Sequence, residues 1–154
     1  MINILTERVF DFMRNNLNKT LESPRTLVFK KGRQPQTFKI VEFDDAKQRI
    51  KIEFQESGTK LPLEFWRFEL AIEFLFERGE FVRIGASLDA QDKSSLEWVL
   101  QKHEKELYGR RAGTKTAPHV GDILVLAGVA EYGKIRNPKT RRMTQAIRLK
   151  TEQP

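Results

Sequence analysis

The stretch of residues 63–78 constrains the fold most, because it is predicted to be a helix with apolar side chains on two separate faces. One face carries Leu63, Trp66, Leu70 and Phe74, and the other carries Phe65, Phe68, Ile72 and Phe76. Glutamates at positions 69, 73 and 77 run between them and predict a narrow solvent-exposed stripe. A helix that is apolar on two sides has to be covered twice. The sequence therefore predicts a helix sandwiched between an N-terminal and a C-terminal layer.

The residues before this helix are predicted to form another helix and a small antiparallel sheet. Apolar residues from Ile2 to Leu17 follow the three-and-four spacing of an amphipathic helix. Residues 26–29, 37–43 and 49–54 alternate in the two-residue manner of strands. The segment 57–59 breaks this pattern, and Pro62 stands where a helix is expected to start. We therefore expect an N-terminal layer at 1–58, a C-terminal module at 59–150 and a disordered tail at 151–154.

The C-terminal module is predicted to contain a short strand at 81–84, two helices and a final β-hairpin. Asp92 or Ser94 is expected to cap the first helix, with Glu97 at the position that a capping box requires. An exposed linker at 109–115 leads to a helix that begins near Thr116 and ends before Gly128. Strands at 129–135 and 143–149 flank a basic loop with a turn-forming Asn-Pro dipeptide. The expected fold is α+β, with the N-terminal helix and sheet packed on this module.

The positive charge of the chain is concentrated near its C-terminus. The chain holds 28 Lys and Arg against 21 Asp and Glu, a formal net charge of +7. Residues 1–108 hold 18 of each sign, whereas residues 109–150 hold 10 basic residues against Asp122 and Glu131. In the hairpin, basic residues at even positions and apolar residues at odd positions predict charge on one face of each strand and core on the other. A local basic face favours a polyanionic partner.

The composition excludes several classes of function. A chain without cysteine has no disulfide and no thiolate metal site, and no apolar run approaches the roughly 18 to 20 residues that span a bilayer. The N-terminus lacks the basic start and unbroken apolar stretch of a secretion signal, so we expect a cytoplasmic protein without a membrane partner. His103 and His119 are too few for a three-histidine zinc site. No metal or cofactor is expected.

From residue 63 onward, the predicted order is helix, strand, helix, helix, strand, basic loop, strand. This order resembles that of the winged-helix family of DNA-binding domains over residues 63–150. The likeness is clearest at residues 123–132, ILVLAGVAEY, which are similar to a recognition helix running into the first wing strand. The resemblance implies a non-enzymatic DNA-binding protein, either a transcription regulator or the recognition module of a restriction or mobile-element system.

The resemblance also implies which residues contact duplex DNA. The loop between the last two strands would be the wing tip, and Thr116, His119 and Asp122 would be the polar face of the recognition helix. Basic residues of the 109–115 linker would contact phosphates at the N-terminus of that helix, where free N–H groups favour anions. The predicted nucleic-acid-binding residues are Arg110, Arg111, Lys115, Thr116, His119, Lys134, Arg136, Lys139, Thr140, Arg141, Arg142 and Arg148.

The predicted recognition helix departs from the family pattern in one respect. Between Thr116 and Gly128 it has no Arg, Lys, Asn or Gln, which are the residues that read base edges bidentately. Two explanations stay open. The helix is buried, for instance against a second copy of the chain in a homodimer, or the base contacts come from its flanks and the wing.

Three other functions stay open. An RNA-binding protein using the same hairpin would prefer structured RNA to duplex DNA. A magnesium-dependent nuclease would use Asp44, Asp45 and Glu53, although the order of these carboxylates and Lys51 is not the usual one. A protein-interaction adaptor would use the apolar helix at 117–127 and would dimerise.

Overall fold

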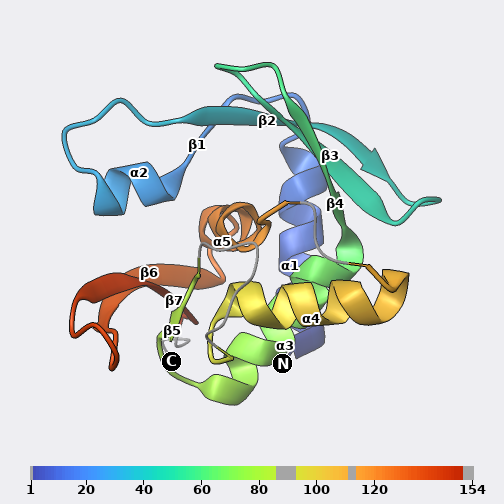
Figure 1. Cartoon of the computed structure of the whole chain (residues 1–154). Coiled ribbons are helices and arrows are strands. Elements are labelled where there is room, and N and C mark those ends of the chain that lie inside the picture. Colours follow the sequence, from blue (N-terminus) through green and yellow to red (C-terminus); the bar gives the residue numbers. More distant parts are fainter. Residues whose placement is uncertain (1, 86–92, 111–113, 151–154) are drawn as a thin grey trace.

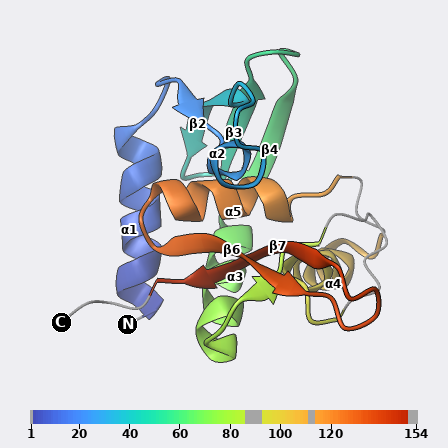
Figure 2. The same cartoon turned by 90° about the vertical axis from the view of Figure 1, so that its left-hand side faces the viewer.

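A computed structural model describes residues 2–85, 93–110 and 114–150 (Figure 1). The fold is α+β, as predicted, with helices packed around two antiparallel sheets. The first sheet has the order β1-β2-β3-β4, formed by Leu21–Glu22, Thr37–Asp44, Arg49–Phe54 and Lys60–Glu64. The second has the order β5-β7-β6, formed by Val82–Arg83, Met143–Leu149 and Ala130–Arg136. Helix α5 (Ala117–Leu126) lies between the two sheets (Figures 1 and 2).

Helices α1 (Ile2–Asn15) and α3 (Phe65–Arg78) pack against each other and contact both sheets: α1 contacts β2, and α3 contacts β4 and β7. The predicted apolar stripe of α1 is confirmed as far as Met13, because Leu5, Val9 and Met13 are buried at four-residue spacing. Leu17, the last residue of the predicted stripe, lies beyond the helix and is 37% exposed. Helix α3 contacts α1 on one side and α4 (Leu96–Tyr108), α5 and β7 on others, so it is covered more than once, as predicted. Phe76, which the sequence placed on one of the two covered faces, is 47% exposed instead. The glutamate stripe of α3 is exposed, also as predicted.

The first sheet continues beyond the boundary that the sequence suggested. Pro62 does not start a helix; it lies in β4, paired with Lys51 of β3, and α3 begins at Phe65. Strand β4 pairs with β3 alone and forms an edge of the sheet, and an edge is where a strand tolerates proline, which lacks an N–H. The N-terminal layer therefore ends at Glu64 rather than near residue 58.

The prediction of a strand at residues 26–29 is wrong. Pro24–Phe29 is a short helix, α2, with the N–H of Lys30 donating to the carbonyl of Thr26 at 3.0 Å. An alternating run of four residues is too short to identify a strand, and Pro24 has the φ angle that the first turn of a helix requires. The ring of Phe29 then packs on that of Tyr132 in β6, with centroids 5.3 Å apart. This contact joins α2 to the second sheet.

Helix α4 begins at a different residue from those predicted. Ser95 caps it, its hydroxyl accepting a hydrogen bond from the N–H of Trp98 at 3.2 Å. Asp92, one of the two predicted caps, lies outside the described residues. Within the described ranges no helix combines the length and the apolar character needed to cross a membrane.

Candidate nucleic-acid interface

The final hairpin is present where the sequence predicts it, with an ordered basic turn between β6 and β7. The N–H of Asn137 donates to the carbonyl of Arg142 at 2.8 Å, and the N–H of Arg141 donates to the carbonyl of Asn137 at 2.7 Å. The side-chain oxygen of Asn137 accepts from the N–H of Lys139 at 2.9 Å. Arg141 has a φ of 61°, a left-handed conformation that closes the turn. These bonds fix the backbone of the turn while its basic side chains stay exposed.

Five exposed cations belong to this hairpin, and they are called the hairpin cations below: Lys134, Arg136, Lys139, Arg141 and Arg142. Thr140, also predicted as a contact, is exposed in the same turn, and its hydroxyl accepts from the N–H of Arg142 at 3.3 Å. No acidic residue occurs from Gly133 to Lys150, so the segment itself contains no carboxylate side chain to compensate the hairpin cations.

The strand register corrects the predicted face of the charges. Tyr132 is paired with Ile147, which is fully buried, and their face of the hairpin packs on α5. Lys134 and Arg136 have the same parity as Tyr132, so they lie on this inner face, further along β6. The prediction that charge and core occupy opposite faces is therefore wrong for β6. Charge and core share one face and are separated along the strand.

Arg148 lies on the other face and is not a free cation. Its Nε donates to a carboxylate oxygen of Glu131 at 3.1 Å, and its guanidinium stacks 4.2 Å from the centroid of the Phe81 ring. An ion pair with a half-exposed carboxylate compensates the charge of Arg148. Of the predicted hairpin contacts, this one is least suited to bind phosphate.

The first residues of the predicted recognition helix are buried rather than exposed. Thr116 is 3% exposed, and its hydroxyl accepts a hydrogen bond from Nη1 of Arg67 at 3.0 Å. A carboxylate oxygen of Glu97 accepts from the N–H of Ala117 at 3.3 Å, so one donor of this helix terminus is already satisfied within the chain. The expectation that Thr116 faces a ligand is therefore wrong.

The partner of Thr116, Arg67, is a buried residue that the sequence did not reveal. The Arg67 guanidinium binds Glu64 and Glu104, each at 2.8 Å, in addition to Thr116. Burial alone would lower the pKa of Arg67, and its two carboxylate partners outweigh that effect and raise the pKa. The three-residue spacing of Glu64 and Arg67 was the available sequence signal. This network joins β4, α3, α4 and the start of α5.

His119 is also turned inward. Its ring packs against that of Phe54 in β3, with centroids 4.9 Å apart. Burial lowers its pKa from 6.5 to about 4, helped by the positive charges of Arg25 and Lys115. The imidazole is therefore neutral near pH 7. It does not supply the charge that a phosphate contact would need.

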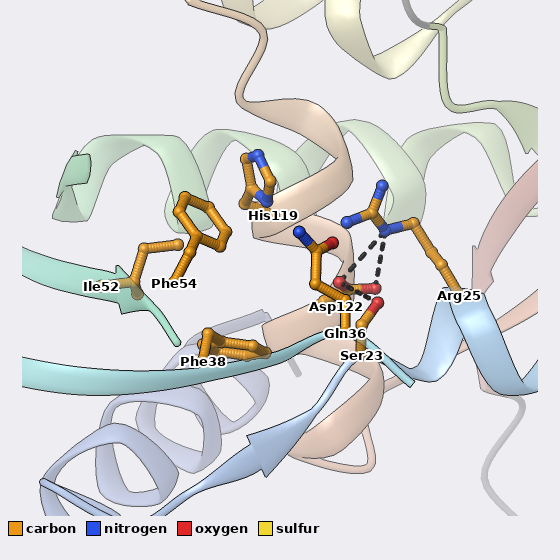
Figure 3. A pocket seen from close by; sticks show the side chains of 8 residues that line it. All are labelled: Ser23, Arg25, Gln36, Phe38, Ile52, Phe54, His119 and Asp122. Atoms are coloured by element: carbon orange, nitrogen blue, oxygen red, sulfur yellow. Dashed lines mark hydrogen bonds and ion pairs between the residues drawn. The ribbon is translucent and has the colours of Figure 1, made fainter. Parts of the chain in front are cut away.

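Asp122, the third member of the predicted polar face, links α5 to the N-terminal layer through hydrogen bonds with Ser23 and Arg25 (Figure 3). It is 2% exposed and accepts hydrogen bonds from Ser23 at 2.8 Å, from Nε of Arg25 at 3.0 and 3.1 Å, and from Tyr132 at 2.6 Å. Burial raises the pKa of Asp122, while Arg25 and the two hydroxyls oppose that effect. Burial and the adjacent carboxylate also raise the pKa of Tyr132. The pocket around these side chains leaves almost no space for a water molecule.

The polar side of α5 is thus covered by the chain's own first sheet and α2. Of the two explanations for its apolar composition, burial holds, and the covering residues come from the same chain. The face that an adaptor would use to dimerise is occupied in the same way, because α5 contacts α1, α2, α3, α4 and β6.

The linker residues before α5 do not all join the hairpin. Arg110 follows the C-terminal end of α4, which lies at the opposite side of the molecule from the hairpin in Figure 1. It lines a cavity of about 430 Å³ together with Arg49 and Tyr108. Lys115 is exposed immediately before α5, and Arg111 lies outside the described residues. The predicted set is therefore divided between at least two surfaces.

The carboxylates considered for a nuclease do not converge. Asp44 is paired with Arg49 at one end of the β2–β3 ladder and accepts a hydrogen bond from the N–H of Lys47 in the turn. Glu53 is paired with Lys39 near the other end, about 13 Å further along β3 at the usual rise per residue. Within the described part of the chain, no group of three or more His, Asp or Glu side chains is placed to hold a metal ion.

Comparison with known proteins gives no relative from which a function could be transferred: the chain matches no protein-family model, no curated protein and no solved structure.

Proposed function

We propose that this protein binds duplex DNA without catalysing a reaction, and that the hairpin cations contact the phosphate backbone. The observation that carries the proposal is the gathering of five exposed cations on one ordered hairpin whose sequence contains no acid from Gly133 to Lys150. Duplex DNA carries about one negative charge per 1.7 Å of axis, and bound Lys and Arg side chains release its counterions. A regulator, or the recognition module of a restriction or mobile-element system, would use such a contact.

The arrangement of the C-terminal elements supports this proposal. From α3 onward the order is helix, strand, helix, helix, strand, strand, and β7 lies between β5 and β6. Both features are compatible with a winged-helix domain whose wing is the β6–β7 hairpin. Because the polar face of α5 is covered, its side chains are not free to read base edges, which favours contacts to the DNA backbone. Such contacts position a protein on DNA without specifying a sequence.

The test is a fluorescence-anisotropy titration of labelled duplex DNA at several salt concentrations. A hairpin variant combines Lys139→Ala, Arg141→Asn and Arg142→Ala; asparagine is chosen because it tolerates the left-handed backbone at position 141. The five hairpin cations contribute about 4 to 5 to the magnitude of the slope of log K against log salt, and the variant should lose about 2 to 3 of these.

A control variant removes the same charge from other surfaces: Lys47→Ala, Lys60→Ala and Lys105→Ala. These exposed lysines lie in the β2–β3 turn, at the start of β4 and near the end of α4, away from the hairpin. The control should keep the wild-type slope. An equal reduction of the slope in both variants would show that only the net charge matters. A preference for structured RNA, with the same effect of the hairpin variant, would show that the hairpin binds RNA instead of duplex DNA. No salt-dependent binding to either polymer would overturn the proposal.

A further inference from the structure

A second basic segment follows α2, in a part of the N-terminal layer for which the sequence predicted no nucleic-acid contact. The loop between α2 and β2 has the sequence KKGRQPQ at residues 30–36, and it is called the α2 loop below. Lys30, Lys31 and Arg33 in this loop are all exposed. The charge count by segment did not reveal this local cluster, because residues 1–108 as a whole hold equal numbers of basic and acidic residues.

The contact between Phe29 and Tyr132 places the start of the α2 loop next to β6, and the loop then runs on to β2 (Figure 1). Lys30 directly follows Phe29, whose ring packs on Tyr132. The face of β6 that carries Tyr132 also carries Lys134 and Arg136, so these two hairpin cations lie on the side of the strand that faces α2. Figure 2 looks onto this side of the molecule and shows α2 at the upper edge of α5 and the hairpin just below α5. The α2 loop and β6 therefore present their cations on one side.

The cations form a row of a length that suits a polynucleotide. From Tyr132 to Arg136, β6 extends about 13 Å, with the C-terminal end of α2 beside Tyr132 and the basic turn after Arg136. One DNA strand has a phosphate about every 3.4 Å along the helix axis, so this span corresponds to about four phosphates. The loop adds three charges at the start of the row and the turn adds three at its end.

We infer that the α2 loop is a second DNA-contacting element, and that Lys30, Lys31 and Arg33 bind phosphates of the same duplex that the hairpin cations contact. The inference rests on the proposed function and extends it to the N-terminal layer. Asp122 holds this layer in place, because its partners Ser23 and Arg25 immediately precede and begin α2 and its partner Tyr132 lies in β6. One buried carboxylate thus sets the position of both basic elements.

A membrane surface is the competing partner for the same loop. Leu27 and Val28 in α2 are 53% and 41% exposed, and apolar side chains beside lysines are found on helices that lie on anionic lipid. Helix α2 has only six residues, which gives little apolar area to insert. The row of cations that continues along β6 favours DNA.

The test uses a loop variant, Lys30→Ala, Lys31→Ala and Arg33→Ala, in the same anisotropy titration on duplex DNA. If both elements bind, about eight contacts give the wild type a slope near −7, and the loop variant should show about −4.5. Between 50 and 200 mM salt, the affinity of the wild type should then fall about 10⁴-fold and that of the loop variant about 500-fold. The control variant, with three lysines removed elsewhere, should behave like the wild type.

The outcomes separate this inference from the proposed function. A hairpin variant that weakens binding together with a loop variant that does not would overturn the inference alone. If neither variant changes the slope, both fail. Sedimentation with vesicles of anionic lipid is the second arm: loss of vesicle binding in the loop variant, with unchanged DNA binding, would assign the loop to a membrane. Circular dichroism and urea midpoints equal to those of the wild type are expected, because all three side chains are exposed.

Discussion

Replacing Asp122 by alanine should cost a large part of the stability of this protein. The carboxylate is 2% exposed and is the shared acceptor for Ser23, Arg25 and Tyr132. Its removal leaves a guanidinium that is 22% exposed, together with two hydroxyls, without their acceptor. Breaking a buried ion pair by removing one partner typically costs about 3 to 5 kcal/mol. We expect Asp122→Ala to lower the free energy of unfolding by this amount, out of the roughly 5 to 15 kcal/mol of a typical domain.

Urea denaturation followed by circular dichroism measures this loss. With an m-value of about 2 kcal/mol/M, the midpoint should fall by about 1.5 to 2.5 M. The matched control is Asp11→Ala, which removes the carboxylate of an exposed ion pair with Arg14 on α1. That pair is worth at most about 0.5 kcal/mol, so the midpoint of the control should hardly move.

A double-mutant cycle with Tyr132→Phe tests the reason for the loss. The single change should cost about 1 kcal/mol, because it removes one hydrogen bond to a carboxylate that keeps its other partners. In the Asp122→Ala background the same change should cost much less, since the hydroxyl has already lost its acceptor at 2.6 Å. Additive losses, or an Asp122→Ala effect below about 1 kcal/mol, would refute the claim that this carboxylate joins the layers.

Two further predictions concern His119 and Gly133. The pKa of His119 falls from 6.5 to about 4 on folding, so the unfolded chain takes up a proton at this residue first as the pH drops. The contribution of the neutral His119 to the free energy of unfolding is therefore fully present above pH 6.5 and is lost toward pH 4. Urea titrations at pH 7 and 4.5 should show a loss of about 2 to 3 kcal/mol from this group, absent from His119→Gln, and equal losses in both proteins would contradict it. Gly133→Ala should cost about 1 to 3 kcal/mol by overpacking, because the new Cβ would lie 2.6 Å from two carbons of the Phe81 ring. Phe81→Ala should relieve most of that cost; if Gly133→Ala destabilises both backgrounds equally, the clash is not its cause.

The parts of the fold that were predictable are those whose signal is local. The alternation on either side of the basic turn gave the final hairpin, and the two apolar faces of α3 required cover on more than one side, as observed. Pro62 was ambiguous, because proline suits both the first turn of a helix and an edge strand. Its pairing with Lys51 decides for the strand, and pairing partners are not visible in local sequence.

The candidate site was harder to predict because its polar residues have partners far away in the chain. Ser23 is 99 positions from Asp122, and Arg67 is 49 positions from Thr116. A polar residue on a short helix looks the same in the sequence whether it meets water or a distant partner. The parity of the hairpin had the same limit, because alternation separates two faces without saying which face the core covers. Only the contacts of Tyr132 with Phe29 and Asp122 show that the inner face of β6 includes Lys134.

The burial of α5 has a consequence for any sequence preference the proposed DNA binding would show. Phosphate contacts by the hairpin and the α2 loop carry no base information, so they predict similar affinity for unrelated duplexes. Base discrimination would have to come from exposed side chains that can bond bidentately to base edges, and Arg141 and Arg142 in the turn are two such groups. Under the proposal, Arg142→Lys would keep the salt slope while reducing any preference for guanine, because lysine keeps the charge but lacks the planar fork of donors. A preference that persists in this variant would have to come from DNA shape, which cationic side chains can read through the width of the minor groove.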